Sequence, residues 1–93
     1  MNALEKDMSE RIEDRLKRMI VERLFLKIAP EKILEDKSLI ETYGVDSVSL
    51  LELVVGIEEE FGVVIGDQEF RVDNFKTVAA LAGFVRAKLE PET

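Results

Sequence analysis

The sequence contains neither cysteine nor histidine among its 93 residues. Without cysteine there can be no disulfide, no thiolate nucleophile and no metal site built on thiolates. Without histidine, the chain also lacks the commonest general base and metal ligand of proteins. The carboxylates, lysines and hydroxyls that remain form no recognisable acid/base group in the sequence. We therefore expect a non-catalytic protein with no metal site of its own.

Long apolar runs are also missing. No segment approaches the roughly 18 apolar residues of a membrane span, and the first residues lack the apolar block of a secretory signal. We therefore expect a cytoplasmic protein with no membrane span. The length predicts one domain over residues 1–93. Residues 90–93 are expected to form a frayed tail, and a monomer is expected for a short acidic protein.

The net charge of −7 is concentrated in the middle of the chain. Residues 31–67 contain ten Asp and Glu against two Lys and Arg, whereas residues 1–30 and 68–93 are close to neutral. An acidic segment of this kind repels nucleic acid and attracts basic protein surfaces. We expect protein partners with basic docking patches and no nucleic-acid partner.

The first half of the chain predicts one long helix followed by a long loop. Apolar residues at helical spacing indicate a helix from about Leu4 to Lys27, with residues 1–8 as a possible extension. Pro30 ends it, because proline disfavours a helical residue before it. The connection over residues 30–46 carries four apolar residues that we expect to anchor it to the core: Ile33, Leu34, Leu39 and Ile40. Tyr43 is expected to place its ring at the core edge and its hydroxyl in water.

Two further helices follow, and end signals define both. Asp46 or Ser47 can cap the first of them, and Gly62 can close its last turn in the left-handed conformation. Thr77 can cap the other, which runs on to Pro91. Between them, residues 63–65 form an apolar plug in a loop, and a short helix is expected over residues 67–72.

The helix after Ser47 has two arcs at helical spacing. The residues expected in the core are Leu50, Leu51, Leu53, Val54, Ile57 and Phe61. The residues on the opposite arc are Ser49, Glu52, Gly56, Glu59 and Glu60. At the boundary, Val48 and Val55 lie beside Glu52 and Glu59. This boundary is either the edge of a core stripe or a docking surface for basic partners with a shallow apolar centre.

These motifs resemble the acyl carrier protein family. The resemblance is carried by Gly44-Val45-Asp46-Ser47-Val48, by Leu51-Glu52-Leu53-Val54, by Ile57-Glu58-Glu59-Glu60-Phe61 and by Phe75-Lys76-Thr77-Val78. It implies an all-α fold: a small up-down helical bundle of three long helices plus one short helix, with a long first loop. Gly66, in place of a frequent proline, and the longer stretch before Thr77 depart from the family pattern.

The resemblance also implies a site. In the family, the serine hydroxyl is esterified to 4′-phosphopantetheine derived from coenzyme A, and this implies the same for Ser47. It implies that Asp46 helps to hold the Mg²⁺ used in the transfer. It implies that Glu52, Glu58 and Glu59 meet basic residues of partner enzymes around Val48 and Val55.

The function implied is that of an acyl carrier. Its partners would be a phosphopantetheinyl transferase and the acyl-transferring and chain-elongating enzymes of fatty-acid or related acyl biosynthesis. The thiol of the arm would supply the group that this chain lacks. Three alternatives remain open: a specialised polyketide or aminoacyl carrier, an unmodified acidic helical adaptor in which Ser47 is an ordinary N-cap, and a carboxylate enzyme.

Overall fold

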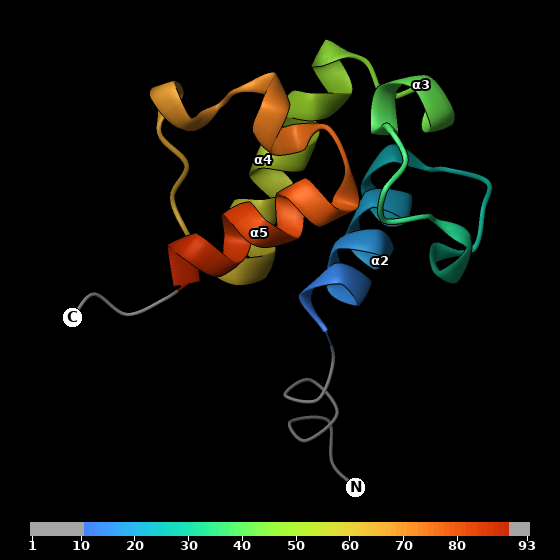
Figure 1. Cartoon of the computed structure of the whole chain (residues 1–93), viewed down its shortest axis with the longest axis horizontal. Coiled ribbons are helices and arrows are strands. Elements are labelled where there is room, and N and C mark those ends of the chain that lie inside the picture. The colour runs from blue at the N-terminus through green and yellow to red at the C-terminus, as the bar shows by residue number, and fades with distance from the viewer. Residues whose placement is uncertain (1–10, 90–93) are drawn as a thin grey trace, which may run out of the picture.

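The computed structural model describes residues 11–89, and the regular elements of this part of the chain are all helical. Three long helices and one short one make up the fold (Figure 1): α2 (Ile12–Leu24), α3 (Leu39–Tyr43), α4 (Ser47–Phe61) and α5 (Val78–Leu89). Three 3₁₀ turns join them: η1 (Pro30–Lys32), η2 (Asp67–Glu69) and η3 (Val72–Phe75). The predicted all-α fold is confirmed.

Helix α2 ends earlier than the sequence predicts. Phe25 adopts the left-handed conformation, with φ of 55°. The next amide, of Leu26, donates back to the Val21 carbonyl at 3.1 Å, which closes the last turn. The predicted end at Lys27 is therefore wrong, and the break precedes Pro30 by several residues. The predicted start at Leu4 and the extension over residues 1–8 lie outside the described residues.

Both ends of α4 carry predicted signals, and of the two candidate N-caps the structure selects Asp46 over Ser47. Asp46 is the N-cap, in extended conformation, and its Oδ1 accepts a hydrogen bond from the Ser49 amide at 2.8 Å. Gly62 has φ of 68° and its amide donates to the Glu58 carbonyl at 2.9 Å. A left-handed residue costs least as glycine, so Gly62 ends the helix without strain.

The short helix predicted over residues 67–72 begins at Asp67 as expected, but it is a 3₁₀ turn that ends at Glu69. Residues 67–72 form no α-helix; instead, η2 and the start of η3 occupy this stretch. The short α-helix is α3, inside the long connection, where the Ser38 hydroxyl accepts from the Glu41 amide at 3.1 Å. This side-chain cap is a local signal that allows one turn of helix to form within the loop.

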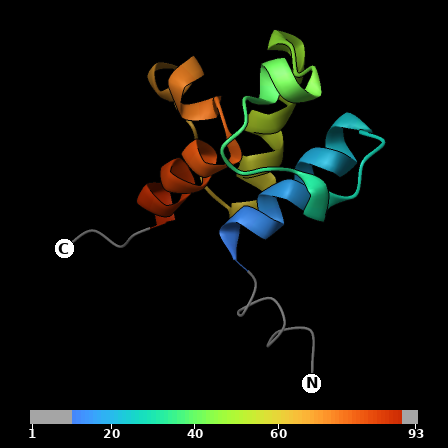
Figure 2. The ribbon, with the colours of Figure 1, turned by 45° about the vertical axis from the view of Figure 1, so that its right-hand side comes forward.

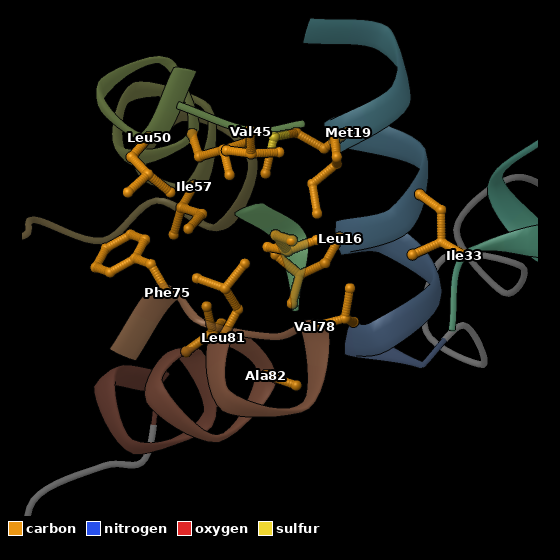
Figure 3. Close-up of a cluster of buried hydrophobic side chains, with 14 of the residues drawn as sticks. Leu16, Met19, Ile33, Val45, Leu50, Ile57, Phe75, Val78, Leu81 and Ala82 are labelled. Carbon is orange, nitrogen blue, oxygen red and sulfur yellow. The ribbon is translucent and has the colours of Figure 1, made fainter. Parts of the chain in front are cut away.

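The core lies where α2 packs against both α4 and α5 (Figures 1 and 2). Figure 3 shows how side chains from each of these helices meet there. The residues buried completely include Leu16, Ile20, Leu53, Ile57, Phe75, Val78, Leu81 and Val85. The predicted Thr77 cap of α5 is confirmed, because its hydroxyl accepts from the Ala80 amide at 3.0 Å.

The long connection is anchored by half of the expected apolar residues. Ile33 and Leu39 are buried in the core, whereas Leu34 and Ile40 are exposed. Neighbouring residues point in different directions here, so only one of each pair faces the core. Two backbone bonds fix the loop on the start of α5: the Leu39 amide donates to the Lys76 carbonyl, and the Ala79 amide to the Glu35 carbonyl, each at 2.9 Å.

Tyr43 ties two parts of the connection together. Its ring packs against the core edge, as predicted. Its hydroxyl, in an exposed position, also accepts a hydrogen bond from the Leu34 amide at 2.8 Å. This bond supports the loop just before the residues that lead into α4.

Candidate functional site

Ser47 stands at the surface as the first residue of α4. The chain reaches it through a turn at Gly44, which has φ of 70°, and through Val45, which is buried. The Val45 amide donates to the Leu39 carbonyl at 3.2 Å and fixes the approach to the helix. With Val45 and Leu50 held in the core, the residues between them face outwards, and the Ser47 hydroxyl is open to a large group.

Asp46 is a charged neighbour of this hydroxyl. Hydrogen bonds from Ser49, first of all from its backbone amide, lower the pKa of the Asp46 carboxyl below its usual value. The carboxylate is therefore ionised at neutral pH. The site thus combines an exposed hydroxyl with a carboxylate at the positive end of a helix, where the free amides of the first turn favour anions.

One exposed face of α4 runs on from Ser47. Val48 is 75 % exposed, Leu51 54 % and Val55 43 %, with Glu52 between them. The predicted boundary of Val48, Val55, Glu52 and Glu59 is thus an open surface and not a covered core edge. The prediction that Leu51 lies in the core is wrong, because α2 and α5 cover the opposite side of the helix. We call Val48, Leu51, Glu52, Val55 and Glu59 the α4 face.

An arginine from α2 joins the two carboxylates of this face. Arg23 donates to Glu52 Oε1 at 3.1 Å and also pairs with Glu59. Its guanidinium crosses α4 over Gly56, where an added Cβ would lie 3.0 Å from Arg23 Nε and 2.6 Å from Met19 Sδ. The expected place of Gly56 on the polar arc is therefore wrong: the residue is buried beneath α2. The sequence does not identify Arg23 as part of this surface. Gly56 is the available signal, because a glycine within an apolar helix often marks the place where another helix packs closely against it.

Glu58 differs from the other predicted docking residues. Its Oε2 accepts a hydrogen bond from the Ile65 amide at 2.8 Å, so the carboxylate turns towards the loop after α4. In that loop Val63 and Ile65 pack against the core, as expected of an apolar plug, while Val64 is exposed. Glu58 thus fixes the loop after α4, in addition to the negative charge that it adds to this side of the helix.

Comparison with known proteins identifies the family. A family model described as the phosphopantetheine attachment site matches residues 14–85. The acyl carrier protein of Buchnera aphidicola subsp. Acyrthosiphon pisum (strain Tuc7) is 39 % identical over 77 residues, covering 83 % of this chain and 91 % of the relative. The chain belongs to the acyl carrier protein family. The acyl carrier protein of Zymomonas mobilis subsp. mobilis (strain ATCC 31821 / ZM4 / CP4) is 37 % identical over 72 residues, 77 % of this chain and 87 % of that protein.

Membership of the acyl carrier protein family confirms two predictions, the family and its cofactor. Acyl carrier proteins hold acyl groups on 4′-phosphopantetheine, and members of the family are in general not enzymes. The residues present fit the group, since an exposed serine hydroxyl opens the N-terminus of α4. Within residues 11–89, no helix is both long and apolar enough to traverse a bilayer.

Proposed function

We propose that Ser47 bears the 4′-phosphopantetheine arm. The observation that carries the proposal is that Asp46, and not Ser47, caps the start of α4. Asp46 supplies the side-chain cap, so the exposed Ser47 hydroxyl is not needed to hold the helix. The hydroxyls of Ser38 and Thr77, by contrast, each accept a capping hydrogen bond. When bound, the arm supplies the thiol that carries an acyl group as a thioester.

Asp46 has a separate role in this proposal. The Asp46 carboxylate repels the negative charge of a phosphodiester attached to Ser47. Its charge is therefore more useful before the arm is attached than afterwards. The exposed, ionised Asp46 carboxylate is positioned to help hold Mg²⁺ while the transferase modifies Ser47. Once the arm is attached, the amides of the first turn of α4 offset the negative charge of the phosphate.

The α4 face is the surface that meets partner enzymes. Its exposed apolar centre at Val48, Leu51 and Val55 is flanked by Glu52 and Glu59, which suit basic residues of a partner. Arg23 already pairs with both carboxylates, so a partner's cation must share or replace that pairing. The resulting docking is weak, as a shuttle that leaves each enzyme requires. Glu58 adds negative charge next to this face.

We place the carrier in fatty-acid or related acyl biosynthesis. Its partners are a phosphopantetheinyl transferase and the acyl-transferring and chain-elongating enzymes, which it meets as a monomer in the cytoplasm. Membership of the acyl carrier protein family supports this placement. Polyketide and aminoacyl carriers share the same chemistry at the serine, and they differ in the cargo found on the arm.

The test is the intact mass of the protein after incubation with coenzyme A, Mg²⁺ and a broad-specificity phosphopantetheinyl transferase. We expect one phosphopantetheine adduct on the wild type and on the control Ser49→Ala, and none on Ser47→Ala. An adduct on Ser47→Ala would place the arm elsewhere. No adduct on folded wild type, even with the transferase from the same organism, would favour the unmodified adaptor.

A further inference from the structure

Phe25 is an aromatic residue in a position that neither its backbone nor its packing explains. It adopts the left-handed conformation, with φ of 55°, where glycine is the favoured residue at the end of a helix. Its side chain is 86 % exposed, so it contributes almost no burial to the fold. A phenylalanine stabilises a protein mainly through the apolar area that it buries. Burial within this chain therefore gives no reason for a phenylalanine at this position.

The end of α2 lies beside the half of α4 that begins with Ser47. The two helices run antiparallel: Arg15 pairs with Glu60, Met19 lies against Gly56, and Arg23, which also pairs with Glu59, reaches Glu52. In Figure 1 the first turns of α4 lie at the top of the molecule, and the last turn of α2 lies lower and to the right, below α3. Phe25, two residues beyond Arg23, thus lies past the level of Glu52, in the direction of the Ser47 end of α4.

Phe25 borders a shallow hollow that it shares with Glu22, Arg23 and Glu52. Glu22 is exposed, and within residues 11–89 its carboxylate forms no ion pair. Glu52 belongs both to this hollow and to the α4 face, so the two surfaces are continuous. The result is an exposed aromatic ring with the Glu22 carboxylate and the Arg23–Glu52 ion pair beside it, next to the proposed docking surface. We call Glu22, Phe25 and Glu52 the Phe25 corner.

We propose that the Phe25 corner is a second contact for the phosphopantetheinyl transferase. This inference rests on the proposed function, because it requires the transferase to dock on the α4 face and act at Ser47. The ring of Phe25 enters an apolar pocket of the transferase. Lysine or arginine residues around that pocket pair with Glu22 and share Glu52 with Arg23. Exposed aromatic side chains are frequent anchors of interfaces, and a surrounding ring of weaker polar contacts excludes water from them.

The experiment is steady-state phosphopantetheine transfer by the transferase of the same organism, with the carrier concentration varied. We expect Phe25→Gly to raise the KM for the carrier about tenfold with little change in kcat, because a binding contact is lost. The same variant should unfold at the same temperature as the wild type or a higher one, since glycine suits a left-handed position. Phe25→Tyr retains the ring and should keep the wild-type KM.

Two controls separate docking from other effects. Val64→Ser removes a comparably exposed apolar side chain in the loop after α4 and should leave the KM unchanged. Glu22→Gln should raise the KM at low ionic strength and have no effect at high salt, where charge pairs are screened. A wild-type KM for Phe25→Gly would overturn the inference. So would a higher KM in Phe25→Gly that comes with a lower unfolding temperature and is also found in Phe25→Tyr. In either case Ser47 would still be modified, whereas failure of the proposed function would leave the wild type without an adduct.

Discussion

At the scale of single residues, Asp46 performs two tasks that one substitution can separate. It caps α4 through its bond with the Ser49 amide, and it places an ionised carboxylate beside Ser47. Asparagine caps a helix as well as aspartate does but carries no charge. We therefore expect Asp46→Asn to keep the unfolding temperature of the wild type and to slow phosphopantetheine transfer at least about tenfold.

The comparison variant for this prediction is Asp46→Ala, which loses both the cap and the charge. Circular dichroism melts and intact-mass time courses would follow the two properties. Transfer to Asp46→Asn at the wild-type rate would show that the charge of Asp46 has no part in the modification.

Tyr43 allows a second prediction at the residue scale. Its hydroxyl accepts from the Leu34 amide, while its ring packs at the core edge. Tyr43→Phe keeps the ring and removes only the hydrogen-bond acceptor, which should cost about 1 kcal/mol of unfolding free energy. Hydrogen exchange of the Leu34 amide should become faster, because its acceptor is gone. Unchanged exchange at Leu34 would contradict the tie between Tyr43 and the loop.

At the scale of elements, the contact between α2 and α4 depends on Gly56. Replacing an exposed helical glycine by alanine generally stabilises a protein by about 0.5–1 kcal/mol. Gly83 in α5 meets this condition, because a Cβ there would have no neighbour within 4 Å. At Gly56 the same Cβ would lie 2.6 Å from Met19 Sδ, and Met19 is held in the core.

We therefore expect Gly83→Ala to raise the free energy of unfolding and Gly56→Ala to lower it by about 1–2 kcal/mol, because Met19 and Arg23 must move. Urea unfolding of both variants at pH 7 would measure the difference. Equal stabilisation by the two substitutions would mean that α2 and α4 adapt to the added methyl group at no cost.

At the scale of the whole molecule, Glu13 of α2 and Arg86 of α5 link two helices that are distant in sequence. The two terminal guanidinium nitrogens of Arg86, Nη1 and Nη2, donate to the Glu13 carboxylate at 2.8 Å. Glu13 is only 8 % exposed. These hydrogen bonds lower the pKa of Glu13 from 4.5 to about 2.

The sign of the pH dependence follows from this lowered pKa. The unfolded chain binds the proton more readily than the folded chain, so the contribution of Glu13 is complete above pH 4.5 and is lost as the pH falls towards 2. We expect Glu13→Gln to cost about 2 kcal/mol at pH 7 and much less at pH 3, where the wild type has lost part of the same contribution. Urea unfolding at both pH values measures this; an equal cost at pH 7 and pH 3 would assign the effect to packing and not to charge.

The sequence by itself determined the ends of α4 and the start of α5. Asp46, Gly62 and Thr77 act through hydrogen bonds and backbone angles within a few residues, so their roles can be read locally. The position of Ser47 at an exposed helix start follows from the same signals. Together with the downstream acidic and apolar residues, they also made the resemblance to the acyl carrier protein family visible.

The tertiary structure alone decided which side of α4 is open. Leu51 has the same apolar character as the buried Leu50 and Leu53, and only the positions of α2 and α5 leave it exposed. Gly56 and Glu52 acquire their roles from Arg23, 29 residues before Glu52 in the chain. The early end of α2 could not be predicted from a glycine, because Phe25 occupies the left-handed position where glycine is usual. Such features depend on side chains that meet only after the chain has folded, and the pattern of one helix does not contain them.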